Sequence, residues 1–214
     1  MSGITPSQTV GPWFAYGLTP DGKYDWSDLA TGNLMTPDVV GEPIRIEGIV
    51  RDGDGAPMPD AMIEIWQADG QGRLPARGNG SKPNTSFKGF GRSPTDPQGL
   101  FWFDTVKPGA LPAPEGGQQA PHILVAVFAR GLLTHLYTRI YFEGEAANAS
   151  DPILKLVPAD RRDTLIAKKA TRDGKTVYRF DSPCREKGKR FSSTSEMLRR
   201  NTGVNRNRNC CLRI

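Results

Sequence analysis

Residues 44–50 read IRIEGIV, and the alternation of apolar and polar side chains in this stretch decides the fold class. A period of two places alternate side chains on opposite faces of a β-strand. The cluster RDGDG follows at residues 51–55 and is typical of a turn, because its glycines can adopt positive φ. We therefore expect a strand that ends in a tight turn.

Similar short runs recur along the chain and are separated by 24 glycines and 18 prolines. Further strands are expected at residues 61–68, 100–106, 123–128, 136–142 and 177–180. The run 123–128 (ILVAVF) is continuously apolar, which indicates burial on both faces. Helical patterns are limited to 146–156 and 159–169, the second with Asp160 as its expected N-cap. The pattern predicts an all-β protein, a β-sandwich with long loops and short helices.

The chain divides into an arm, one domain and a tail. Residues 1–43 form an extended arm rich in proline and glycine that carries five aromatic side chains: Trp13, Phe14, Tyr16, Tyr24 and Trp26. This arm either packs on its own domain or embraces a neighbouring subunit, where aromatic residues are enriched. Residues 44–181 form the β-sandwich, and residues 182–214 form a basic tail.

Charge and cysteines narrow the class of protein. Of 28 Lys/Arg and 23 Asp/Glu, nine and two lie in 182–214, which leaves 19 basic and 21 acidic residues in 1–181. The basicity therefore belongs to the tail, and the domain lacks the basic surface of a nucleic-acid binder. No stretch is long and apolar enough for a membrane span, and no signal peptide is visible, so we expect a cytoplasmic protein. Three cysteines, all after residue 181, do not make a disulfide framework.

No common catalytic motif is present, and His122 and His135 are the two histidines of the chain. His135, Tyr137 and Tyr141 share one face of a strand and are ligand types that suit iron. However, they spread over about 20 Å at about 3.3 Å per residue, so we favour a polar-aromatic strand face over a metal site.

The chain nevertheless resembles the intradiol ring-cleavage dioxygenases, which open catechols between their hydroxyl groups with non-haem Fe(III). The resemblance covers about residues 4–181. It rests on the segments EIWQADGQGR (64–73), FGRSPTD (90–96), VKPGA (106–110), APHI (120–123), FARG (128–131) and IYFEG (140–144), together with TPSQT (5–9) and GP (11–12). It implies the β-sandwich that the strand pattern also predicts.

The resemblance also implies four metal-ligand positions, two tyrosines and two histidines. In this chain Leu74, Leu111 and Leu124 replace three of them, and His122 alone is retained. Gln119 replaces the arginine that assists the chemistry in the family. Because leucine has no donor atom for a hard ferric ion, we expect no catalytic residue and no metal in this chain. We expect His122 to be a buried ring that hydrogen-bonds to nearby backbone.

Two-chain members of the family pair an alpha-type chain with a beta-type chain that binds Fe(III). The resemblance therefore implies that this chain is the alpha type, with a dihydroxybenzoate, protocatechuate, as substrate of the hetero-oligomer. Expected substrate-binding residues are Thr9, Gly11, Pro12, Trp13 and Arg130, with tryptophan at position 13 where the family has tyrosine. A guanidinium at position 130 suits the ring carboxylate, although an ion pair with Asp or Glu across the subunit contact is the alternative. A stand-alone β-sandwich binding module without activity is the other interpretation of the chain.

The tail departs from the family at residue 182. Family members end in a strand of the type IxLQGEGETVFFDI, whereas residues 182–195 read SPCREKGKRFSSTS. Codons for IPLQGEGETVFFDI, read one base further on, encode this chain's residues 182–195. We therefore interpret the tail as a frameshifted, disordered segment, the alternative being a natural basic tail.

Overall fold

The computed structural model describes residues 17–19, 31–75, 86–113, 116–130, 132 and 135–181. Ten strands lie within these ranges: β1 (Pro43–Ile49), β2 (Met62–Trp66), β3 (Phe90–Pro94), β4 (Leu100–Val106), β5 (Leu111–Pro112), β6 (Gln118–Gln119), β7 (His122–Phe128), β8 (Leu136–Phe142), β9 (Ile166–Arg172) and β10 (Lys175–Arg179). The predicted all-β class is confirmed, and each of the six predicted strands coincides with an observed strand to within about two residues.

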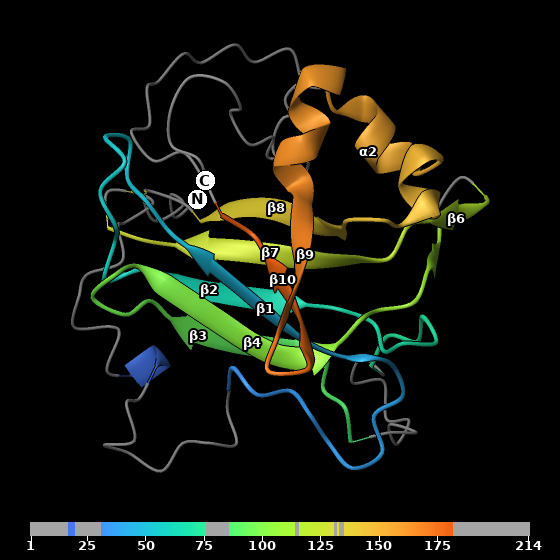
Figure 1. Ribbon diagram of the computed structural model, residues 1–214, viewed down its shortest axis with the longest axis horizontal. Helices are drawn as coiled ribbons and strands as arrows, with labels where there is room; N and C mark the ends of the chain where they lie inside the picture. Colours follow the sequence, from blue (N-terminus) through green and yellow to red (C-terminus); the bar gives the residue numbers. More distant parts are fainter. Residues whose placement is uncertain are drawn as a thin grey trace, which may run out of the picture.

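Eight strands form one nearly closed sheet in the order β3-β2-β7-β8-β9-β10-β1-β4 (Figure 1). Two four-stranded layers, β3-β2-β7-β8 and β9-β10-β1-β4, are joined by a short parallel pairing of β8 with β9, where Tyr141 lies opposite Ile166. The alternation read from residues 44–50 places Ile44 and Ile46 of β1 inside. The two layers thus make the predicted β-sandwich.

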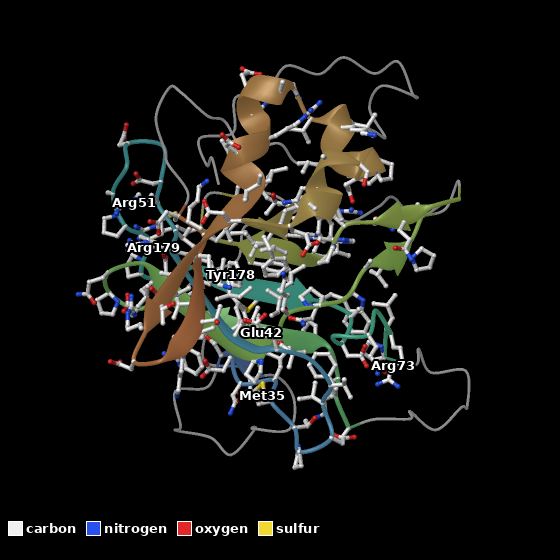
Figure 2. All side chains as sticks on the ribbon, turned by 45° about the vertical axis from the view of Figure 1, so that its right-hand side comes forward. Met35, Glu42, Arg51, Arg73, Tyr178 and Arg179 are labelled. Atoms are coloured by element: carbon white, nitrogen blue, oxygen red, sulfur yellow. The ribbon has the colours of Figure 1, made fainter. Side chains whose placement is uncertain are left out.

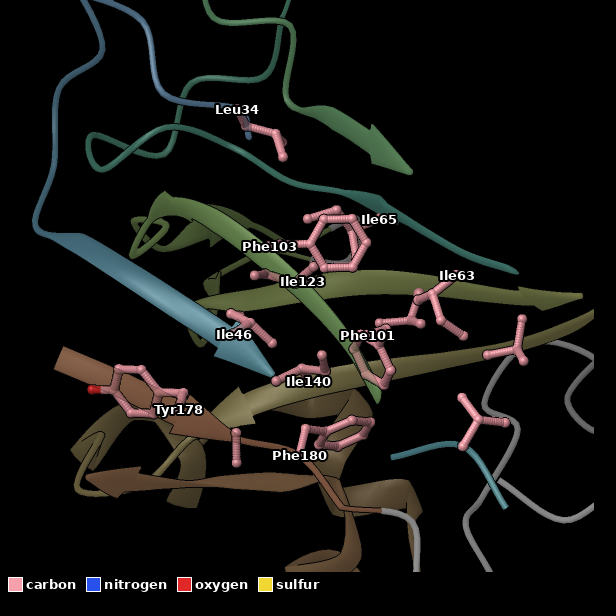
Figure 3. Close-up of a cluster of buried hydrophobic side chains, with 14 of the residues drawn as sticks. Leu34, Ile46, Ile63, Ile65, Phe101, Phe103, Ile123, Ile140, Tyr178 and Phe180 are labelled. Carbon is pink, nitrogen blue, oxygen red and sulfur yellow. The ribbon is translucent and has the colours of Figure 1, made fainter. Parts of the chain in front are cut away.

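The core lies between the two layers (Figure 3). Ile63 and Ile65 of β2 and Ile123 of β7 point toward side chains of the opposite layer, among them Ile46 and Phe103. On β7 the odd-numbered residues 123, 125 and 127 are buried in this core, whereas Leu124 and Ala126 face outward. The continuously apolar strand therefore has one outward face that is only partly covered, contrary to the expectation of burial on both faces.

The helical segments pack together over one end of the layer containing β7 and β8 (Figure 1). They are η1 (Ala146–Ala149), α2 (Pro152–Leu156) and η2 (Ala159–Leu165). The helix expected at 159–169 was wrong in its second half, because β9 begins at Ile166 and pairs with β10 and β8. Asp160 is not the N-cap; Pro158 takes that position without a side-chain bond, and Asp151 instead caps α2.

Parts of the arm are described and are anchored to β3. Arg92 Nη1 donates a 3.0 Å hydrogen bond to the Leu18 carbonyl, and the Arg92 amide donates to the Thr31 carbonyl at 3.1 Å. Thr9, Gly11, Pro12, Trp13 and the whole of 182–214 lie outside the described residues. Within the described part of the chain, no helix is long and apolar enough to cross a membrane.

Candidate functional site

The four ligand positions implied by the sequence meet at one end of the sandwich, and we call Leu74, Leu111, His122 and Leu124 the leucine corner. His122 and Leu124 lie on the outward face of β7, opposite Tyr141 and Arg139 of β8 respectively. Leu111 of β5 lies opposite Gln119 of β6. Leu111, His122 and Leu124 therefore lie on two consecutive hairpins, β5–β6 and β7–β8. Gln119, at the position of the family's arginine, lies on the first of these hairpins.

Leu74 reaches this end through a tight loop that follows β2. Gly72 has φ +76°, and a Cβ added to it would lie 2.1 Å from the Ala110 carbonyl oxygen, so this backbone approach requires glycine. The Gly109 amide donates a 2.8 Å hydrogen bond to the Asp69 carbonyl. Figure 2 shows Arg73, the neighbour of Leu74, at the end of the molecule opposite to Arg51 and Arg179. This hydrogen bond and the close backbone approach therefore hold the loop 69–73 against the turn 107–110.

A guanidinium group, which the sequence did not predict, lies beside the leucine corner. Arg139 Nη1 donates a 2.9 Å hydrogen bond to Gln119 Oε1 and lies 3.4 Å from the hydroxyl of Tyr141. Arg139 also lies directly opposite Leu124 in the register of β7 and β8. The positively charged guanidinium of Arg139 thus lies next to Leu124, one of the four ligand positions.

Behind Arg139, a second small core lies under the helical segments. The Tyr141 hydroxyl donates to Asp151 Oδ1 at 3.1 Å, and Asp151 is fully buried. The same carboxylate accepts from the Ala120 amide at 2.8 Å and caps α2 through the amides of Ile153 and Leu154 at 2.9 and 2.7 Å. Burial raises the pKa of Tyr141. Asp151 therefore cross-links the leucine corner to the helical cover.

His122 is the buried ring that the sequence predicts. Its Nδ1 lies 2.8 Å from the Ala120 carbonyl oxygen, and its ring packs against Tyr141 with centroids 5.9 Å apart. Burial, together with the nearby positive charge of Arg139, lowers the pKa of His122 from 6.5 to about 4. The imidazole is therefore not protonated at neutral pH.

The leucine corner does not fit a ferric ion. Three positions carry apolar side chains, His122 is tied to backbone, and the cation of Arg139 repels any metal ion that approaches. The described residues contain no cluster of three or more His, Cys, Asp or Glu suited to a metal. The alternative trio is also separated, because His135 and Tyr137 contact each other at 4.5 Å at the start of β8 while Tyr141 bonds Asp151 at its other end.

Arg130 lies at the opposite end of β7 from His122. Its side chain is 60% exposed, and its nearest acid is Asp60, with Nε 3.6 Å from Oδ1. That contact is too long for a hydrogen bond, and Asp60 Oδ1 is buried without a hydrogen-bond partner. Rings of Phe128, His135 and Tyr137 are in contact at this same end, with centroid distances of 5.0 and 4.5 Å. Arg130 thus has one weak contact inside the chain and lies two residues after Phe128, a member of this aromatic group.

An open cleft of about 710 Å³ lies elsewhere, where β3 and β4 approach each other. Its charged lining residues are engaged, since Arg92 pairs with Glu64 at 2.6 Å and Asp96 accepts from the Gln98 and Leu100 amides. Trp102, also in the lining, is covered on one face by Arg45 at 4.7 Å. This cleft contains neither of the sequence-predicted groups, Arg130 or the leucine corner.

The sequence interpretation missed Arg139 and Asp151. Register would have revealed Arg139, because antiparallel pairing of 122–128 with 136–142 places it beside Leu124. The Asp151-Pro152 pair is a helix-start signal, with proline at the first helical position. Neither residue stands out as catalytic by type alone.

Comparison with known proteins defines the class. A family model described as "Dioxygenase" matches residues 26–187. The protocatechuate 3,4-dioxygenase alpha chain of Burkholderia cepacia is 50% identical over 182 residues, which cover 83% of this chain and 90% of that protein. The chain belongs to the intradiol dioxygenase family. Within that family it is a homologue of protocatechuate 3,4-dioxygenase alpha chains, since the alpha chain of Pseudomonas putida is also 43% identical over 83% of this chain and 89% of its own length.

A beta chain is a more distant relative, and solved dioxygenase structures share the fold. The protocatechuate 3,4-dioxygenase beta chain of Burkholderia cepacia is 32% identical over 174 residues, 78% of this chain and 74% of that one. Among solved structures, chlorocatechol 1,2-dioxygenase from Pseudomonas putida superposes with a TM-score of 0.57 at 25% identity, over 71% of this chain and 64% of that one. The dioxygenase domain of a Streptomyces carbohydrate-binding fusion gives 0.54 at 24% identity, over 82% and 96%.

Proposed function

We propose that this chain is the iron-free alpha subunit of a protocatechuate 3,4-dioxygenase, paired with a beta-type subunit that holds the Fe(III). The complex would cleave protocatechuate with dioxygen to 3-carboxy-cis,cis-muconate. The identities of 50% and 43% to alpha chains of that name support this assignment. A beta-chain relative at 32% identity supports a partner of the same fold. The ferric ion would supply Lewis-acid and redox chemistry in the partner's site.

The observation that carries this proposal is the separation of Arg130 from the leucine corner. The strand β7 runs from His122 to Phe128, about 20 Å at about 3.3 Å per residue, and Arg130 lies beyond its far end. A single-ring substrate cannot reach from one to the other. An arginine that binds substrate at position 130 must therefore serve a reaction centre on another chain.

Arg130 is suited to this role by its exposure and by its weak internal contact. At 3.6 Å from Asp60, the guanidinium keeps its donors available for a carboxylate. Protocatechuate carries a ring carboxylate, and two charge-assisted hydrogen bonds from one guanidinium would hold it in a fixed orientation. Thr9, Gly11, Pro12 and Trp13 would form the neighbouring wall of the partner's site.

Co-expression with a beta-type subunit tests the assignment. We expect iron and protocatechuate-dependent oxygen uptake in the purified pair, and neither in this chain alone. Stoichiometric iron in this chain alone would contradict the proposal. If no pair forms and no activity appears, the stand-alone binding module becomes the better description.

A matched pair of variants tests Arg130 itself. In the complex, R130Q should lower kcat/KM for protocatechuate by about tenfold to a hundredfold, the usual effect of losing a hydrogen bond to a charged group. The slow turnover of catechol, which has no carboxylate, should not change. D60N removes the internal contact but keeps Arg130, and it should leave both substrates unaffected. An equal loss of kcat/KM in R130Q and D60N, or an equal loss for protocatechuate and catechol, would show that Arg130 acts only through its ion pair with Asp60.

A further inference from the structure

Arg139 has an unusual set of contacts for a half-buried arginine. Its side-chain hydrogen bonds to Gln119 Oε1 and the Tyr141 hydroxyl both use Nη1. Its Nε is buried and has no hydrogen-bond partner. None of the ion pairs within the described ranges includes Arg139, so this cation lacks a carboxylate there. A buried donor without an acceptor is costly and calls for a partner that binds it.

Two other arginines in the same sandwich show which partner fits. Arg45 directs Nε and Nη2 to the two carboxylate oxygens of Asp104, at 2.8 and 2.7 Å. Arg92 directs the same two nitrogens to Glu64 Oε1, at 2.9 and 2.6 Å. Arg73 also uses Nε and Nη2 toward Asp69, whereas Arg172 uses Nη1 and Nη2 toward Glu47. The edge formed by Nε and Nη2 is thus a recurrent carboxylate-binding edge among these arginines. In Arg139 the opposite nitrogen is engaged and this edge is left without an acid.

The nearby acid does not satisfy Arg139. Asp151 lies behind Tyr141, and its two oxygens already accept from the tyrosine hydroxyl and three backbone amides. His122, whose Nδ1 lies 2.8 Å from the Ala120 carbonyl oxygen, supplies no carboxylate to Arg139. On the outer side Arg139 lies opposite Leu124, which is 38% exposed. The guanidinium of Arg139, which has no carboxylate partner in the described residues, therefore lies next to the exposed side chain of Leu124.

The geometry points to a carboxylate-binding site at Arg139, in which the guanidinium holds the carboxylate, Nη2 being the nitrogen that has neither a hydrogen bond within the described residues nor a place among their buried unpaired atoms, and Leu124 contacts the apolar part of the ligand. The ligand is a carboxylate with an apolar body, of the benzoate type. The site takes an anion at the corner where iron-bearing members of the family hold a cation. The carboxylate comes either from a free acid or from an Asp or Glu side chain of a partner subunit, and these two sources give different results below.

Benzoate is the probe for the free acid, with benzamide as its neutral isostere. Titration calorimetry on the full chain alone should show saturable benzoate binding and at least tenfold weaker benzamide binding. R139Q should weaken benzoate binding at least tenfold. R139K should behave like R139Q, because lysine keeps the charge but lacks the two-nitrogen edge. R172Q, which removes one exposed arginine already paired with Glu47, is the charge-matched control and should bind benzoate like the wild type.

The same titration in the complex with a beta-type subunit identifies the source. Unchanged benzoate affinity in the complex indicates a free acid. Loss of benzoate binding in the complex, with at least tenfold weaker subunit association for R139Q than for R172Q, indicates an acidic side chain of the partner. Equal affinity for benzoate and benzamide, together with unchanged association of R139Q, would overturn the proposal. Turnover of protocatechuate by the complex is measured separately, so failure of this site and failure of the proposed function are distinguishable.

Discussion

Arg139 donates a 2.9 Å hydrogen bond to Gln119 Oε1 and so links β8 to β6 across the leucine corner. Gln119 stands where the family resemblance places an arginine, and Arg139 supplies a guanidinium from the adjacent strand instead. A metal ion would tie the same loops together through coordinate bonds. Here hydrogen bonds of Arg139 and Asp151 connect β6, β8 and α2.

Restoring the missing ligands should not by itself restore iron. The variant L74Y/L111Y/L124H supplies two phenols and an imidazole, yet Arg139 remains next to the new ligands and repels a trivalent cation. We expect iron well below one equivalent in this variant and a clear gain when R139Q is added. Metal analysis and the visible absorption of ferric phenolate measure both steps.

The unmodified chain and R139Q alone are the controls for that experiment, and both should remain free of iron. Equal iron content in the triple and quadruple variants would show that Arg139 is not the obstacle. The position of the three leucines, rather than the charge beside them, would then limit metal binding.

The buried imidazole of His122 predicts a loss of stability in acid. Its pKa is about 4 in the folded protein and 6.5 as its ordinary value, so the unfolded chain binds a proton that the folded chain does not. The free energy of unfolding is therefore unaffected above pH 6.5 and falls as the pH drops from 6.5 to 4, by up to about 3 kcal/mol. Urea unfolding across this range measures the effect, and H122Q should flatten it.

H135Q provides the matched control, because it removes the other histidine, which is exposed. Its pH dependence should keep the acid loss seen in the wild type. Persistence of the full loss in H122Q would assign the effect to another group.

Much of the fold follows from the sequence because period-two alternation survives wherever one face of a strand is buried. Residues 44–50 and 100–106 were recognised for this reason, and both strands were found. β9 was missed because its residues 168–172 are all exposed, so no alternation exists to read. Ile166 and Ala167 become strand through pairing with β8, and residues 168–172 through pairing with β10, a tertiary preference that overrides the local helical pattern.

The site was predicted less completely, and for a different physical reason. Three leucines at ligand positions are visible in the sequence once the resemblance is known. The link from Arg139 to Gln119 depends on the register of β7 and β8 and on the short β6, which carries no periodic signal. The substrate-binding role of Arg130 stays a prediction; within this chain the guanidinium lies 3.6 Å from Asp60.

Asp151 should be a major determinant of stability. D151A leaves the Ala120 amide and the Tyr141 hydroxyl without an acceptor in a buried place and removes the cap of α2. We expect a loss of about 3 kcal/mol in the free energy of unfolding. Y141F removes one of these bonds and should cost about 1 kcal/mol. D160A, at an exposed acid of η2, should change stability by less than about 0.5 kcal/mol. Similar losses for D151A and D160A in chemical unfolding would contradict this role.

Arg92 should influence turnover through the arm. Its Nη1 holds the Leu18 carbonyl at 3.0 Å, a few residues after the arm positions proposed to line the partner's site. R92K keeps a positive charge for Glu64 but loses this bond, and it should lower kcat/KM of the complex by about threefold to tenfold. E64Q keeps Arg92 and the Leu18 contact and should leave kcat/KM unchanged. Loss of activity in E64Q equal to that in R92K would place the effect in the ion pair instead of the arm.

The last prediction concerns residues 182–214 and the end of β10. β10 pairs in parallel with β1 from Ile44 to Glu47, and the Phe180 amide still donates to the Glu47 carbonyl at 2.8 Å. β1 continues to Ile49, so a longer β10 would find a partner there. We propose that the natural frame after Asp181 encodes such a strand, and that adding one base after this codon restores it.

The protein with the restored frame should unfold at a higher urea concentration and associate more tightly with a beta-type subunit, because a strand edge is then paired. Resequencing the gene at this codon and comparing the two proteins by urea unfolding test this; a confirmed reading frame with equal stability of both forms would show that the basic tail is the natural end.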